Sequence, residues 1–210
     1  MGRIERTLSK KGFKIVEDLT CGSNRSVYLV ECQGRRSIVK VPQLQRPLCE
    51  DHMTVSGIDL RCRIAHNMNE AQFLREMKGH PMIPELFGEF TMPMQFYLIK
   101  IEAETEGVMP FVQKNGIVGI HQELIKGRKL REAERITDLA AKQRLIDFFK
   151  QATEKGYSAF DLGELRNDIL IDGEGMPHVI DFGTVRKFDD SAPTRSRVKW
   201  ELETIEKKLF

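Results

Sequence analysis

The sequence predicts an α+β fold in which an antiparallel sheet with one helix comes first and a mainly helical part follows. Two observations support this prediction. Residues 13–41 form three runs of alternating apolar and polar side chains separated by turn residues, which is typical of antiparallel strands. After Gly127 the apolar residues recur with a helical period. The 210 residues are enough for one domain or for two small ones.

Short apolar runs predict the strands of the first half. Glycine, proline or polar residues bound each run, and each run has the length of one strand. The candidate strands are residues 13–19, 26–33, 36–41, 85–90, 95–102 and 117–125. Short turns join the first three, so we expect these strands to be antiparallel neighbours.

Two segments between these strands follow other patterns. Residues 42–65 have no regular period and predict a long loop or an inserted element. Residues 66–78 predict a helix on which Glu70, Leu74 and Met77 share one face. This helix should therefore turn a carboxylate toward the apolar interior.

The second half is predicted to be mainly helical. Residues 131–155 have apolar side chains at helical spacing, and Gly156 follows at a position where glycine commonly ends a helix. Residues 168–172 and 178–182 predict two short strands, and residues 195–210 predict a closing helix.

The composition excludes several classes of protein. The chain has 33 lysine and arginine residues and 31 aspartate and glutamate residues, and 33 minus 31 gives a net charge of +2, too small to indicate a nucleic-acid partner. Twelve phenylalanines and nine methionines argue against disorder. No apolar run reaches the roughly 18 residues of a membrane helix, and no apolar signal segment follows the N-terminus. We therefore expect a cytoplasmic protein with no membrane span.

The four cysteines lie far apart and predict reduced thiols rather than a disulfide framework. By spacing, Cys49 with His52 and Cys62 with His66 could be zinc ligands. Such pairs also arise easily in loops without binding any metal.

One ordered set of motifs extends along most of the chain, from about Gly12 to Phe188. Its members are Gly22 in a turn, Lys40 in a strand, Glu70 on a helix, Glu123–Ile125 before Gly127, Asp161–Leu162 and Asp181–Gly183. Each motif alone occurs by chance, whereas their common order is specific. This order resembles the protein kinase-like superfamily. The resemblance implies a two-lobed fold with a five-stranded antiparallel sheet and one helix in the N-lobe, at about 12–126, and a truncated, mainly helical C-lobe, at about 127–210.

The resemblance implies an ATP site. Gly22 and Ser23 would cover the phosphates, although Gly22 is the only glycine kept of the usual three. Lys40 would bind the phosphates while paired with Glu70. The backbone of Glu123 and Ile125 would contact adenine. The apolar walls around the base would come from Val27, Ile38 and Leu170, residues that would fit equally well as ordinary core packing.

The resemblance also implies catalytic and Mg²⁺-binding residues. Asp161 would orient the acceptor hydroxyl, and Asp181 would be the main Mg²⁺ ligand. Asn167 and Asp168 are both candidates for the second ligand, because the loop before them is two residues longer than in the family. Ala159 and Phe160 replace the family's His and Arg, so Phe160 cannot grip a phosphorylated loop.

Only 27 residues follow Gly183 (210 minus 183), too few for an activation segment and a full C-lobe. In this the chain resembles minimal RIO-type kinases, the small kinase of the tRNA threonylcarbamoylation complex and bacterial lipopolysaccharide core kinases. It therefore resembles an ATP- and Mg²⁺-dependent serine/threonine protein kinase of minimal type. There are two alternatives. The protein could be a nucleotide-binding pseudokinase that regulates a partner, or a kinase of sugars or other small molecules. Fold cannot distinguish a protein acceptor from a small-molecule one.

Overall fold

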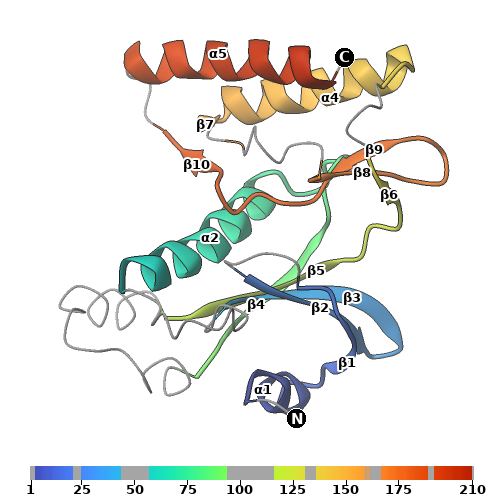
Figure 1. The fold of residues 1–210 in the computed structure, drawn as a ribbon, viewed down its shortest axis with the longest axis vertical. Helices are drawn as coiled ribbons and strands as arrows, with labels where there is room; N and C mark the ends of the chain where they lie inside the picture. The colour runs from blue at the N-terminus through green and yellow to red at the C-terminus, as the bar shows by residue number, and fades with distance from the viewer. Residues whose placement is uncertain are drawn as a thin grey trace, which may run out of the picture. The chain divides into compact units, whose positions relative to one another are not determined.

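The protein has the α+β fold that the sequence predicts (Figure 1). The computed structural model describes residues 3–20, 25–43, 57–93, 116–130, 136–158, 160, 167–188 and 192–209. In chain order, its elements are α1 (Arg3–Lys10), β1 (Lys14–Asp18), β2 (Arg25–Cys32), β3 (Arg35–Pro42), α2 (Gly57–Glu76), β4 (Leu86–Thr91), β5 (Val118–Glu123), β6 (Arg128–Lys129), α4 (Leu139–Glu154), β7 (Tyr157–Ser158), β8 (Ile169–Ile171), β9 (Pro177–Val179), β10 (Arg186–Lys187) and α5 (Ala192–Leu209). No helix in the described part of the chain is long and apolar enough to cross a membrane.

The chain divides into two compact units. The first comprises Met1–Ala71 and Leu86–Leu124, and the second comprises Gln72–Glu85 and Ile125–Phe210. The division falls within α2, whose residues up to Ala71 belong to the first unit.

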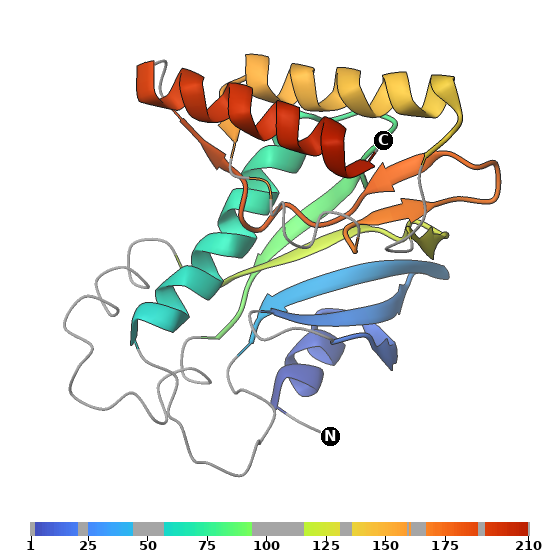
Figure 2. The ribbon, with the colours of Figure 1, turned by 45° about the horizontal axis from the view of Figure 1, so that its top comes forward.

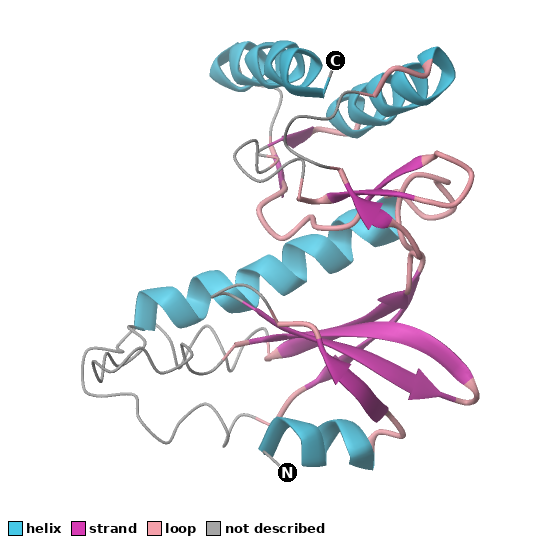
Figure 3. Ribbon diagram, turned by 45° about the vertical axis from the view of Figure 1, so that its right-hand side comes forward, coloured by secondary structure: helices cyan, strands magenta, loops and turns pink. Residues whose placement is uncertain are grey.

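The first unit is built on a five-stranded antiparallel sheet with the strand order β1-β2-β3-β5-β4. In β2 and β3 the register pairs Val27 with Lys40 and Leu29 with Ile38. In β3 and β5 it pairs Lys40 with Ile120. Figures 2 and 3 show α1 on one side of this sheet and α2 on the other. The predicted strand at 95–102 lies outside the described residues.

A continuous apolar core holds the first unit together. Leu8 of α1, Ile64 of α2, and Val39 and Val41 of β3 have no exposed surface, and they belong to one cluster of buried side chains. Burial of one such side chain contributes about 1.5–3 kcal/mol. Helix α1 was not predicted from the sequence, because it is only two turns long and contributes one fully buried leucine to this core.

Residues 57–65, which the sequence predicts as part of a long loop or an inserted element, are helical. These residues form the first half of α2, which begins at Gly57 rather than near residue 66. Tertiary contacts explain the difference. Ile64 packs into the core, and the buried Arg63 donates a hydrogen bond from Nη1 to the carbonyl oxygen of Gln43 at 2.8 Å. Residues 44–56 lie outside the described part of the chain.

The second unit contains α4, α5 and short strands. Helices α4 and α5 lie side by side (Figures 1 and 2). Helix α4 begins at Leu139, later than the predicted position of about 131, because Asp138 caps it: the carboxylate Oδ1 accepts a hydrogen bond from the Ala141 N–H at 2.6 Å. Gly156 follows this helix with φ +84°, as its predicted role requires.

An aromatic cluster forms the centre of the second unit. Phe73, near the end of α2, stacks on Phe182 with ring centroids 4.4 Å apart. Phe148 of α4 and Tyr157 of β7 meet Phe73 edge to face. All four side chains are essentially without exposed surface. The position of Phe182, and of the chain on either side of it, is therefore fixed by packing.

Gly127 makes the closest backbone approach in the second unit. A Cβ atom at this position would lie 2.7 Å from the carbonyl oxygen of Ile171 in β8. Glycine is thus required for close packing, and not only to let the chain turn.

Gly127→Ala should lower the free energy of unfolding by about 1–3 kcal/mol, because the backbone of β8 cannot yield to the added methyl group without a shift. Gly173→Ala is the matched control, since a Cβ atom there would meet nothing within 4 Å. Urea unfolding of both variants measures the difference. Equal stability of the two variants would contradict the proposed reason for Gly127.

Candidate functional site

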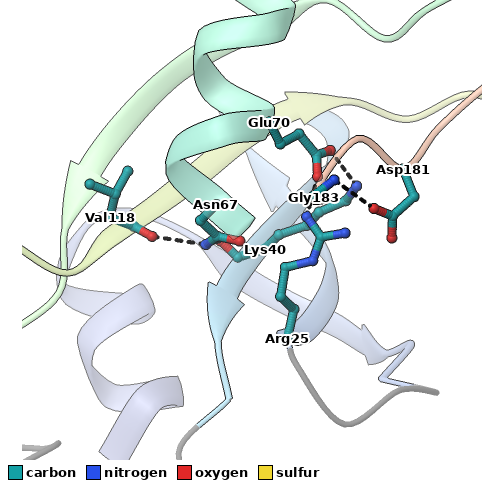
Figure 4. A network of polar contacts seen from close by, with 7 residues as sticks. All are labelled: Arg25, Lys40, Asn67, Glu70, Val118, Asp181 and Gly183. Atoms are coloured by element: carbon teal, nitrogen blue, oxygen red, sulfur yellow. Dashed lines mark hydrogen bonds and ion pairs between the residues drawn. The ribbon is translucent and has the colours of Figure 1, made fainter. Parts of the chain in front are cut away.

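Lys40 and Glu70 form a buried ion pair in the first unit. Lys40 extends from the middle of β3, and Glu70 from the face of α2 that covers the sheet. The ammonium Nζ lies 2.5 Å from carboxylate Oε1, and the two side chains are 7% and 0% exposed (Figure 4). The pairing of Lys40 with Glu70 was predicted only from the order of the motifs. In the structure, the two side chains are in direct contact.

Arg25 is a third member of this cluster, and the sequence reasoning missed it. Its guanidinium Nη1 contacts Glu70 Oε2, so the two oxygens of one carboxylate bind two different cations (Figure 4). The Arg25 side chain is as buried as that of Lys40. The sequence holds one signal for Arg25. It lies two residues before Val27, a predicted site residue, and side chains two residues apart lie on the same face of a strand.

Asn67 fixes α2 against the sheet. Its amide Nδ2 donates to the carbonyl oxygen of Lys40 at 3.1 Å and to that of Val118 at 2.8 Å (Figure 4). Asn67 is fully buried and lies three residues before Glu70, on the same face of the helix. The same helix therefore holds Lys40 by its backbone and by its side chain.

The sheet register places further predicted residues beside Lys40. Val27 is its partner in β2, and Ile38 lies two residues before it in β3, so all three share one face of the sheet. Gln122 of β5 pairs with Ile38 and shares this face. Gln122 is 2% exposed, and within the described residues its Oε1 has no hydrogen-bond partner. The sequence reasoning did not single out this buried amide.

The predicted adenine-contacting residues follow at the end of β5. Glu123 is the last residue of this strand and pairs with Ser37 of β3. Ile125 is the first residue of the segment assigned to the second unit, and it is half-buried.

Asn167, Asp168 and Asp181 lie at one end of the β8–β9 hairpin. The register pairs Ile169 with Val179, and the N–H of Ile180 donates to the carbonyl of Asp168 at 2.9 Å. Asn167 and Asp168 both come directly before β8, and Asp181 follows β9, just outside the paired residues of the two strands. Leu170, in β8, pairs with His178 and is half-buried.

The Asp181 carboxylate is oriented by the turn that follows it. Its Oδ1 accepts a hydrogen bond from the Gly183 N–H at 3.0 Å (Figure 4). The adjacent Phe182 is buried in the aromatic cluster. The buried ring of Phe182 and the turn at Gly183 thus fix the position of Asp181.

Phe160 is a core residue. It is 6% exposed and meets Phe149 edge to face at a centroid distance of 5.0 Å. Phe160 therefore serves packing in the second unit. Three predicted site residues, Gly22, Ser23 and Asp161, lie outside the described part of the chain, as does Ala159.

Strand β10 fixes the chain directly after Gly183. Lys187 binds Glu76 of α2 at 2.6 Å, and its ammonium lies over the ring of Tyr157. The hydrogen bond from Lys187 lowers the pKa of Glu76, and that from Gln72 adds to the effect. Burial raises the pKa of Tyr157, with the Glu76 carboxylate contributing in the same direction.

The zinc hypothesis gains no support from the described residues, in which no group of three or more His, Cys, Asp and Glu side chains could hold a metal ion. Two of the four candidate ligands lie on α2, where Cys62 is exposed and His66 is half-buried. The other two, Cys49 and His52, are outside the described ranges.

Glu70→Ala should lower the free energy of unfolding by about 3–5 kcal/mol, because it leaves two buried cations without their common carboxylate. Glu31→Ala is the control: Glu31 and Lys14 form a pair at 3.5 Å with side chains 41% and 77% exposed. Loss of such a surface pair costs less than about 1 kcal/mol. Similar losses in the two variants, measured by urea unfolding, would show that the buried cluster contributes no more than a surface pair.

No protein-family model and no curated protein matches the sequence. Solved structures match the fold, and one is a chain in the structure of the CAK (CDK-activating kinase) complex from Chaetomium thermophilum bound to ATP-γ-S. The two chains are 20% identical with a TM-score of 0.55. The match covers 91% of this chain and 53% of the other, so the chain spans about half the length of this neighbour. This likeness concerns the fold: the chain has a protein kinase-like α+β fold, as its motif order predicts.

Proposed function

We propose that the protein is an ATP- and Mg²⁺-dependent phosphotransferase that acts on a hydroxyl group, of the minimal serine/threonine protein kinase type. The observation that carries this proposal is the buried ion pair of Lys40 and Glu70. Further support comes from the fold and from the ATP analogue in the structure of the CAK complex, one chain of which has a similar fold. The domain would be a single kinase-like one, with its lobes at about 12–126 and 127–210.

The chemistry of the pair favours phosphate binding. A buried ammonium costs free energy unless it is paired, so a lysine kept in such a place needs a carboxylate to hold it. Glu70 does this from the helix, and it holds the ammonium at a defined point on the sheet face. A fixed cation is what a nucleotide triphosphate requires, because phosphoryl transfer depends mainly on positioning and electrostatic stabilisation.

The other roles follow from the motifs. Val27, Ile38 and Leu170 would supply apolar contacts to the base, and the backbone of Glu123 and Ile125 would hydrogen-bond it. Gly22 and Ser23 would lie against the phosphates. Asp161 would accept or orient the proton of the acceptor hydroxyl.

The residues at the end of the β8–β9 hairpin fit Mg²⁺. The Asp181 carboxylate and the Asn167 amide supply oxygen ligands, which this ion prefers. When bound, Mg²⁺ would neutralise negative charge on the phosphate oxygens. Asn167 and Asp168 are both candidates for the second ligand, because both come directly before β8, at the end of the hairpin where Asp181 follows β9.

A nucleotide-binding regulator of a partner protein is the second candidate. The burial of Phe160 favours it, because the residue before Asp161 serves packing and carries no charge. A kinase of sugars or other small molecules would use the same ATP-handling residues, and differs from the first proposal only in its acceptor.

Wild-type protein should transfer label from γ-labelled ATP in the presence of Mg²⁺, either to itself or to a serine/threonine peptide mixture. Lys40→Met, Asp161→Asn and Asp181→Ala should each reduce the rate by about 10²-fold or more, because each removes a group that positions or stabilises the reacting atoms. Lys14→Met is the control, since Lys14 is 77% exposed and forms a surface pair with Glu31. A sugar panel as acceptor tests the small-molecule alternative.

Two outcomes would contradict the enzyme proposal. If wild type is as inactive as the variants but Mg-ATP raises its melting temperature, the protein is a nucleotide-binding regulator. If Mg-ATP causes neither transfer nor a melting shift, both candidates are wrong.

Loss of the second Mg²⁺ ligand should raise the Mg²⁺ concentration needed for half-maximal transfer by about tenfold. A titration of the activity of Asn167→Ala and Asp168→Ala with Mg²⁺ identifies this ligand as the residue whose variant shows the larger rise. Wild-type behaviour of both variants would contradict a Mg²⁺ ligand at either position.

A further inference from the structure

Arg25 is a buried cation for which the proposed function supplies no role. Arg25 is the first residue of β2. Val27 lies two residues later on the same face of the strand and pairs with Lys40 of β3. Arg25 and Lys40 therefore approach Glu70 from neighbouring strands. The guanidinium takes Oε2 of the carboxylate and the ammonium takes Oε1 (Figure 4).

The sharing of one carboxylate changes the electrostatics of Lys40. A carboxylate spreads one negative charge over its two oxygens, and a guanidinium is a permanent cation that binds carboxylates strongly. While Arg25 holds Oε2, Lys40 contacts a carboxylate whose charge is already offset by another cation. Without Arg25, the full charge of Glu70 would act on the ammonium alone.

We propose that Arg25 is a positioning residue for the phosphate-binding lysine: by holding Oε2 of Glu70, it fixes the carboxylate and leaves the Lys40 ammonium able to attract nucleotide phosphates. This inference rests on the proposed function, because it concerns the same nucleotide site. It assigns to Arg25 the selectivity for nucleotides with several phosphates over nucleosides.

The selectivity has a physical basis that a merely structural role would not share. The attraction between a cation and a ligand grows with the charge of the ligand, whereas contacts with the base do not. Loss of Arg25 should therefore weaken ATP binding more than ADP binding, and leave adenosine binding nearly unchanged.

Calorimetry with the full-length chain tests the proposal, with ATP, ADP and adenosine as ligands. Arg25→Ala should weaken ATP binding by about tenfold and adenosine binding by less than about twofold. Arg25→Lys should restore most of the ATP affinity, because lysine supplies a cation to Oε2. Arg25→Gln provides a second neutral variant if Arg25→Ala fails to fold. Arg36→Ala is the control, because Arg36 is an exposed arginine of β3. This variant should bind all three ligands as wild type does.

A double-mutant cycle separates this proposal from direct contact of Arg25 with phosphate. In a Glu70→Gln background, loss of Arg25 should weaken ATP binding by less than about threefold, since the carboxylate through which it acts is gone. An equal loss in both backgrounds would mean that Arg25 touches the phosphates itself, and would overturn the positioning role. Equal weakening of ATP and adenosine would also overturn it.

The outcome for wild type distinguishes the two hypotheses. If wild type binds ATP and Arg25→Ala binds it equally well, the inference about Arg25 is wrong and the proposed function stands. If wild type binds neither nucleotide nor nucleoside, the proposed function fails, and the role of Arg25 fails with it.

Discussion

The structure of the first unit depends on one buried negative charge. Glu70 has no exposed surface, and two cations from neighbouring strands bind its two oxygens. A buried carboxylate is tolerated only where paired cations and hydrogen bonds replace the water that it has lost. Lys40 and Arg25 therefore make it possible for α2 to bury the Glu70 carboxylate against the sheet.

Strand register brings Arg25 and several of the predicted site residues together on one face of the sheet. Because alternate residues share a face, the pairing of β2 with β3 places Arg25, Val27, Ile38 and Lys40 together. In the second unit, the β8–β9 hairpin brings the residues before β8 and the residues after β9 to one end of the hairpin. In each unit, regular backbone pairing positions groups that are distant in sequence, while buried aromatic or aliphatic side chains hold that backbone in place.

The parts of the fold that could be predicted from sequence are those with a strong local pattern. Strands β1, β2 and β3 follow from alternation, and Lys40 and Glu70 follow from their order among the motifs. The start of α2 could not be predicted, because Ile64 and Arg63 are held by contacts with distant residues rather than by a local period. Arg25 could not be predicted either, since a charged residue in a turn-proximal position is exposed far more often than buried. The sequence shows only that Phe160 stands where the resembled family has an arginine. Its packing against Phe149 depends on the tertiary structure.

Asn67 binds the carbonyl oxygen of Lys40, a group that every amino acid carries. This hydrogen bond between α2 and β3 therefore does not depend on which side chain stands at position 40. A related chain with another residue at position 40 could therefore keep this hydrogen bond. It would differ from this chain in the charge beneath α2 and not in the architecture of the unit.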